Sequence, residues 1–190
     1  MRGLLPISVG SKKLRIIESH KNILEKQFGI HIIVDKKNSI VYLKADKDTL
    51  PYKFLKAKQA IEAISLGFPA KSALKLSDDN IFFEVMDLTE VYRDKRDLKR
   101  IKARIIGSEG KVKVLIEEMT GTEIAVGEKE VGIIGDYEQV KTAREAIEMI
   151  IRGRSHRSVN NFLRIESRKL KKRRLELWEK TQSIFDERRS

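Results

Sequence analysis

The chain has no cysteine, only three prolines and a single tryptophan among its 190 residues. The absence of cysteine excludes disulfide bonds, thiolate zinc sites and cysteine nucleophiles, and it fits the reducing environment of the cytoplasm. No apolar run is long enough for a membrane-spanning helix, and residues 1–6, MRGLLP, lack the apolar segment of a signal peptide. We therefore expect a cytoplasmic protein that does not associate with membranes.

Signals for catalysis and for metal binding are also missing. The three histidines, His20, His31 and His156, lie far apart and lack the paired spacing of metal ligands. The sequence contains no Walker-type loop, and we find no nucleophile with a neighbouring base. We therefore expect no enzymatic activity, no metal and no cofactor.

Positive charge is what the sequence has in excess. Forty Lys and Arg against 28 Asp and Glu give a formal net charge of +12, and the isoelectric point is near 9.8. Residues 152–174 hold ten Lys and Arg against one acidic residue, Glu166, so this segment supplies +9 of the total. Charge concentrated in this way attracts polyanions, which makes nucleic acid the first partner to consider.

The sequence contains an internal repeat. Residues 57–67, AKQAIEAISLG, and residues 143–153, AREAIEMIIRG, agree at six of eleven positions. In both segments alanine and isoleucine recur at helical spacing, and the final glycine stands where a helix C-terminus favours a left-handed residue. Each segment is therefore predicted to be an amphipathic helix that ends at its glycine.

The residues before these two helices follow one common order. Two strand candidates separated by a turn precede each helix, at 29–34, 37–39 and 40–43 in the first repeat and at 121–126, 127–129 and 131–134 in the second. A helical stretch and a further strand candidate lie upstream, at 22–28 and 4–9, and at 113–119 and 82–91. The pattern predicts an α+β protein built from two units of order strand, helix, helix, strand, strand, helix.

One loop of the second repeat has the chemistry of a phosphate-binding site. Residues 105–113 read IIGSEGKVK, which places Gly107 and Gly110 between two predicted helices. Glycine lets a sugar–phosphate backbone approach the main chain, and a helix that begins at Lys111 would direct its free N–H groups at the phosphates. A Gly-x-x-Gly loop between helices is the RNA clamp of KH domains. The pattern alone is weak, because residues 132–135, GIIG, repeat it inside a predicted strand.

We predict an RNA-binding surface around this loop. Basic residues flank the loop, two isoleucines before it would form a floor on which bases stack, and a histidine lies within a cluster of arginines further along. Glu109 opposes this function, since an acidic side chain inside the loop repels phosphate. The predicted RNA-binding residues are Arg104, Ile105, Ile106, Gly107, Ser108, Gly110, Lys111, Lys113, Arg152, Arg154, His156 and Arg157.

These motifs carry a family resemblance. Residues 98–153 resemble a type I KH domain, and residues 5–164 resemble archaeal members of the two-KH pre-ribosomal family known in eukaryotes as partner-of-Nob-one. The matching motifs are RIIG at 104–107 with Gly110, IEEMTG at 116–121, VGIIG at 131–135 and RGRSHRSV at 152–159. The resemblance implies binding near the 3′ end of small-subunit ribosomal RNA. It also implies contact with the endonuclease that trims this end and with the alpha subunit of archaeal initiation factor two.

The first repeat departs from the family pattern. When the repeats are aligned through Gly29 and Gly121, residues 15–18, RIIE, fall at the clamp position, and no glycine lies between Gly10 and Gly29. We therefore expect the first repeat to brace the second or to contact protein. The predicted domains are a KH-like domain without a clamp at 1–80, a type I KH domain at 81–160, and a basic C-terminal helix or tail at 161–190.

The C-terminal segment has an apolar stripe at seven-residue spacing, Leu163, Leu170, Leu177 and Ile184. A coiled coil needs a second apolar column, but charged residues occupy those positions. The segment is therefore interpreted as a basic helix that lies along RNA or docks one edge on a partner, or as a solvated or disordered segment.

Two functions remain open at this point. The first is an RNA-binding assembly factor for the small ribosomal subunit, which the clamp motif and the basic clusters favour. The second is a protein-interaction scaffold in ribosome biogenesis or translation initiation with nonspecific RNA affinity, which Glu109 and the missing first clamp favour. A subunit of an RNA-decay machine is disfavoured, because no RNA-binding fold of the barrel type is evident.

Overall fold

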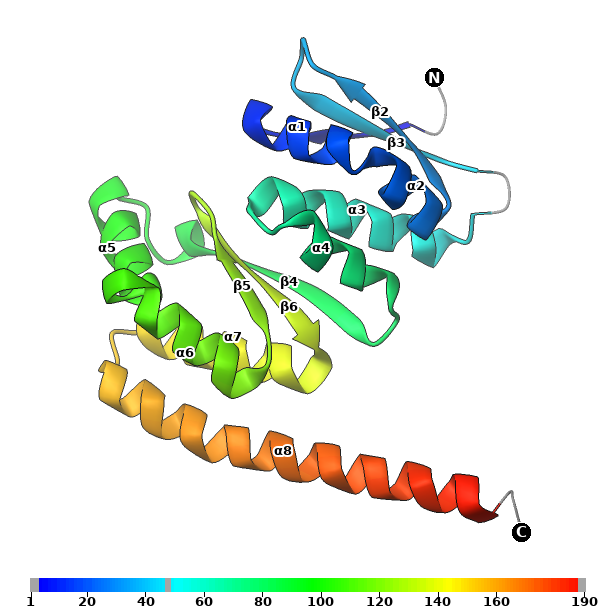
Figure 1. Ribbon diagram of the computed structural model, residues 1–190. Coiled ribbons are helices and arrows are strands. Elements are labelled where there is room, and N and C mark those ends of the chain that lie inside the picture. Colours follow the sequence, from blue (N-terminus) through cyan, green and yellow to red (C-terminus); the bar gives the residue numbers. More distant parts are fainter. Residues whose placement is uncertain (1–3, 47–48, 188–190) are drawn as a thin grey trace. The chain divides into compact units, whose positions relative to one another are not determined.

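The computed structural model describes residues 4–46 and 49–187, with side chains described as far as Glu179 (Figure 1). The predicted order of elements occurs twice. The first repeat comprises β1 (Leu4–Ser8), α1 (Ser11–Ser19), α2 (Lys21–Phe28), β2 (Ile30–Asp35), β3 (Ile40–Ala45) and α3 (Pro51–Leu66). The second comprises β4 (Ile81–Asp87), α5 (Lys95–Ile106), α6 (Lys111–Thr120), β5 (Glu123–Val126), β6 (Glu130–Asp136) and α7 (Tyr137–Ile151). A short helix α4 (Ala70–Leu74) lies between the repeats, and α8 (His156–Glu187) follows them.

The two repeats form sheets of identical topology. Each sheet has three antiparallel strands, in the orders β1–β3–β2 and β4–β6–β5. In both cases the third strand of the repeat lies in the middle. Val41 of β3 pairs with Ile7 and Val34, and Gly132 of β6 pairs with Val85 and Ala125 in the same way. The predicted α+β class is therefore confirmed.

The described residues divide into two compact units that do not follow the repeats. The sheet unit comprises Met1–Leu98 and Glu123–Tyr137, and so contains both sheets and α1 to α4. The helical unit comprises Lys99–Thr122 and Glu138–Ser190, and so contains α6, α8, the part of α5 from Lys99 onward and all of α7 except Tyr137. The domain boundaries at residues 80 and 160 remain a prediction.

The sheet unit has one continuous hydrophobic core, and α3 shows why its sequence fits there. Ala57, Ala60 and Ala63 are buried beside Ile61 and Ile64, because the small alanines let the helix approach its neighbours closely while the isoleucines fill the remaining space. The second repeat contributes Ala125 and Ile134 to the same core. Burial of the α3 stripe is thus the structural basis of the repeated sequence pattern.

The second Gly-x-x-Gly sequence, at 132–135, lies in strand β6 as predicted. A Cβ on Gly132 would come within 2.7 Å of the Phe68 ring and 3.1 Å of the Phe83 ring. These two rings pack edge to face with centroids 6.0 Å apart. Gly132 is therefore required for aromatic packing, and it forms no phosphate-binding loop.

Helix α8 is packed on one face near its start and exposed from residue 171 to residue 179. Val159, Leu163 and Ser167 are buried at four-residue spacing, and α8 contacts α6. The predicted stripe ends after Leu170, which is half-buried, since Leu177 is exposed; the side chain of Ile184 lies outside the described residues. Every side chain from 171 to 179 is exposed. Within the described ranges, no helix combines the length and apolar character needed to cross a membrane.

Candidate nucleic-acid interface

The loop between α5 and α6 adopts a backbone that its glycines make accessible. Gly107 has φ 74° and ψ 175°, a combination essentially restricted to glycine, and Gly110 is left-handed with φ 79°. A Cβ on residue 107 would lie 2.9 Å from the backbone nitrogen of Val112, whereas a Cβ on residue 110 would meet no atom within 4 Å. Gly107 is therefore needed to form the turn, and Gly110 leaves open space in front of the next helix.

Helix α6 presents an N-terminus suited to an anion. It begins at Lys111, as predicted, no side chain caps its start, and its first turn contains no acidic residue. The first N–H groups of a helix lack intrahelical partners and lie at the positive end of the helix dipole. A phosphate that approaches over Gly110 would find these donors unobstructed by a side chain at that position.

Carboxylates of the same segment hold the two lysines of the predicted site. Lys111 Nζ lies 2.9 Å from a Glu109 oxygen, and Lys113 Nζ lies 2.9 Å from both oxygens of Glu117. The Lys111–Glu109 pair is exposed, and such pairs contribute about 0–1 kcal/mol, so a phosphate can displace the Glu109 carboxylate. The Lys113–Glu117 pair is partly buried. Lys113 and Glu117 are four residues apart on one helix, a spacing from which their ion pair can be predicted. The pairing of Glu109 with Lys111 was not predicted, because Glu109 was interpreted only as a source of repulsion.

Arg104 and Ile105 have structural positions that differ from their predicted ones. The Arg104 guanidinium donates hydrogen bonds to the carbonyl oxygens of Ile150, at 3.0 Å, and Arg154. Ile105 is 0% exposed, so its predicted place on a groove floor is wrong and its side chain belongs to the packed interior. Arg104 therefore links the helix before the clamp to the turn after α7.

The apolar surface beside the loop comes from two other side chains. Ile106, at the end of α5, is 37% exposed, and Val114, in α6, is 44% exposed. Ile106 is among the RNA-binding residues predicted from the sequence, whereas Val114 is not. The sequence signal for Val114 is that an apolar residue stands on the polar face of the amphipathic helix α6. These two residues are candidates for contact with bases.

The basic turn at 152–157 is ordered by its own backbone and side chains. Gly153 is left-handed with φ 81°, and the Ser155 hydroxyl accepts a hydrogen bond from the Ser158 N–H at 3.2 Å, which caps the start of α8 at His156. Arg152 pairs with Glu148 at 3.2 Å. Arg154 and Arg157 are exposed and form no ion pair among the described side chains, so their charge is available to a ligand.

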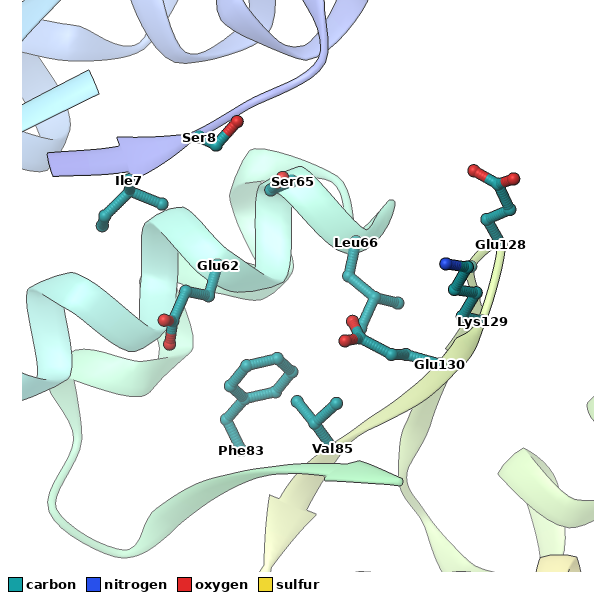
Figure 2. Close-up of a pocket in the computed structure, with 11 residues that line it drawn as sticks. Ile7, Ser8, Glu62, Ser65, Leu66, Phe83, Val85, Glu128, Lys129 and Glu130 are labelled. Carbon is teal, nitrogen blue, oxygen red and sulfur yellow. The ribbon is translucent and has the colours of Figure 1, made fainter. Parts of the chain in front are cut away.

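A separate cavity in the sheet unit has the opposite character. It measures about 630 Å³, and Figure 2 shows Phe83 and Val85 rising into it from β4 beneath Leu66. Its charged lining residues are Glu62, Glu128, Glu130 and Lys129. The excess of carboxylates repels a polyanion, so this cavity is not a candidate site for RNA.

Repeated antiparallel sheets and a Gly-x-x-Gly loop between helices define a KH-domain protein. A family model described as "Eukaryotic type KH-domain (KH-domain type I)" matches residues 82–168, which confirms the predicted type I KH domain. KH domain-containing protein MJ0443 of Methanocaldococcus jannaschii is 36% identical over 164 residues, covering 86% of this chain and 72% of that protein. The chain therefore belongs to the archaeal branch of the PNO1/Dim2 family of KH-domain proteins, as the resemblance predicted.

Two further similar proteins have names or titles that refer to ribosomal RNA. Pre-rRNA-processing protein PNO1 of Debaryomyces hansenii is 29% identical over 147 residues, which span 76% of this chain but only 58% of that protein. The Pyrococcus horikoshii chain solved in an a/eIF2alpha–aDim2p–rRNA complex is 29% identical, with a TM-score of 0.79 over 87% of this chain and 94% of that one.

Proposed function

We propose that this protein binds small-subunit ribosomal RNA near its 3′ end during assembly of the small ribosomal subunit. The observation that carries the proposal is the loop at 107–110, whose positive-φ glycines open onto the uncapped start of α6. Membership of a family with pre-rRNA-processing members and a relative solved with rRNA support the choice of ligand.

In the proposed complex the RNA backbone passes over Gly110 toward the N-terminus of α6. The phosphate replaces Glu109 as the partner of Lys111, while Arg154 and Arg157 extend the positive surface along the basic turn. Unstacked bases contact Ile106 and Val114. The function is binding rather than catalysis, and the names of the relatives describe no enzyme.

We further propose that the chain comprises two tandem KH domains, at 1–80 and 81–160, and a basic helix at 161–190. The identical strand orders of the two sheets and the repeated order of elements support this division. The proposed partners are ribosomal RNA, the alpha subunit of initiation factor two, as in the Pyrococcus horikoshii complex, and the endonuclease implied by the sequence resemblance. The proposed location is the cytoplasm.

A scaffold with nonspecific RNA affinity is the second candidate function. The ion pair between Glu109 and Lys111 favours it, because this pair lowers the positive charge at the clamp. A scaffold would bind RNA through the basic helix and would tolerate changes in the loop. Substitutions in the loop at 107–110 therefore distinguish the two proposed functions.

The discriminating experiment is a pair of substitutions at one position, Gly110→Asp and Gly110→Asn. Both side chains tolerate the left-handed conformation, and the space in front of residue 110 is open, so both variants should fold. We expect Asn to weaken RNA binding a few-fold by obstruction and Asp to weaken it more than about tenfold through repulsion of phosphate. Fluorescence anisotropy with a single-stranded RNA measures the affinity, and circular dichroism checks the fold. Parent-like binding by both variants would reject the loop as the site.

A further inference from the structure

Besides the acidic cavity lined by Phe83 and Val85, the sheet unit contains a groove whose lining is mainly basic. It lies between α1 and the turn after β2 and measures about 600 Å³. Its lining residues are Ser11, Lys12, Leu14, Arg15, Glu18 and Lys36. Three cationic side chains therefore share one concave surface with a single carboxylate.

Two of these cations are available to a ligand. Lys12 and Arg15 are three residues apart on α1, which places them on the same side of the helix. Both are exposed, and neither forms an ion pair with a carboxylate among the described side chains. Leu14 is only 4% exposed and provides an apolar floor beneath them.

The third cation is held across the groove. Lys36 Nζ lies 2.8 Å from a Glu18 carboxylate oxygen, and both side chains remain largely exposed. An ion pair between exposed side chains is weak, so an anion in the groove can compete with Glu18 for Lys36. The groove would then surround that anion with positive charge from α1 on one side and from the turn on the other.

We infer that this groove is a second contact for the RNA backbone, in which side-chain cations bind phosphate without a glycine clamp. The inference rests on the proposed RNA-binding function and adds a site in the sheet unit to the site in the helical unit. An RNA strand is favoured over an acidic protein segment because the same chain already offers it a first site. A strand long enough to reach both sites would bind more tightly than either site alone allows, because the first contact raises the effective concentration at the second.

Substitution of Glu18 should change RNA affinity in the direction opposite to substitution of Lys12 and Arg15. Removal of Lys12 and Arg15 deletes phosphate contacts, whereas Glu18→Gln frees Lys36 and removes a repulsive charge. The two changes should therefore move RNA affinity in opposite directions, although both alter exposed side chains of the same helix. A purely structural role for α1 would not produce this reversal.

The test compares Lys12→Gln/Arg15→Gln with a matched control, Lys26→Gln/Lys53→Gln. The control removes the same charge from exposed positions of the sheet unit outside the groove. Affinity for a labelled single-stranded RNA is measured over a series of salt concentrations in the full-length protein. We expect the groove variant to bind about tenfold more weakly, with its salt slope reduced by about 1.4, and the control to stay near the parent. Glu18→Gln should bind two- to threefold more tightly.

The same measurements in a Gly110→Asp background separate this inference from the proposed function. If the groove variant matches its control in affinity and slope, the inference is overturned, whatever Gly110→Asp does. If Gly110→Asp binds like the parent while the groove variant is weakened, the proposed clamp fails and the groove stands. A poly-glutamate peptide serves as the alternative probe. Loss of peptide binding with unchanged RNA binding would assign the groove to acidic proteins and overturn the inference.

Discussion

The two repeats share their order of elements and their sheet topology but differ where their first two helices meet. In the second repeat, four residues separate α5 from α6, and three of them have positive φ. In the first, the single residue His20 separates α1 from α2, with φ −109° and ψ 8°. The comparison shows that one fold accommodates either an open junction, suited to a phosphate, or a closed one.

The polar groups at the closed junction form hydrogen bonds with the last turn of α1. The His20 N–H donates to the carbonyl oxygens of Ile16 and Ile17, each at 3.2 Å, and the Ser19 hydroxyl donates to Ile16 at 2.9 Å. These bonds use the carbonyl groups that a helix C-terminus leaves without partners. The first repeat therefore lacks the open backbone of a clamp, and any RNA contact there must come from side chains.

The substitutions with the largest expected effect test whether the open junction requires glycine at Gly107 and at Gly110. We expect Gly107→Ala to lower the free energy of unfolding by about 3 kcal/mol, because alanine is strained at this φ and ψ and its Cβ would approach Val112. Gly110→Ala should cost about 1 kcal/mol, the penalty of the left-handed region alone. Urea denaturation of the two variants measures the difference. Equal losses would mean that the turn at Gly107 relaxes without strain.

The second prediction compares arginines from the two repeats. Arg104→Ala should lower the free energy of unfolding by about 2 kcal/mol, since it removes charge-assisted hydrogen bonds to Ile150 and Arg154. Arg15→Ala should change it by less than about 0.5 kcal/mol, because Arg15 is exposed. Its effect should appear in RNA binding instead. Thermal unfolding and RNA titration of both variants test whether Arg104 mainly stabilises the fold and Arg15 mainly binds RNA. If Arg15→Ala lost as much stability as Arg104→Ala, this difference in roles would be contradicted.

Periodicity predicted the backbone better than it predicted the site. The repeated stripe in α3 and α7 identified both helices because a buried face constrains every third or fourth residue. Glycine spacing likewise located the loop. The position of Arg104 was beyond sequence reasoning, because its carbonyl partners lie at residues 150 and 154, far along the chain. Ile105 and Ile106 are adjacent and alike, and only the rotation of the helix end decides which one is buried.

The smallest expected effect concerns an ion pair that joins the two repeats within the sheet unit. Lys75, after α4, donates to Glu123 of β5 at 2.5 Å. Burial raises the pKa of Glu123, but hydrogen bonds from Lys75 and Ser72 outweigh this effect and leave the pKa below its ordinary value of 4.5. A carboxyl group whose pKa is lowered in the folded state stabilises the fold above its unfolded pKa and loses this contribution as the pH falls.

We therefore expect Glu123→Gln to reduce the free energy of unfolding by less than about 1 kcal/mol at neutral pH, since the pair is partly exposed. The difference from the parent should shrink as the pH falls through 4.5 toward the lowered pKa of Glu123. Glu128→Gln is the matched control, because Glu128 is exposed and has no ion pair among the described side chains. Urea denaturation across this pH range measures both variants. A difference that stays constant with pH would show that the Glu123 side chain stabilises the sheet unit through packing, with no contribution from its charge.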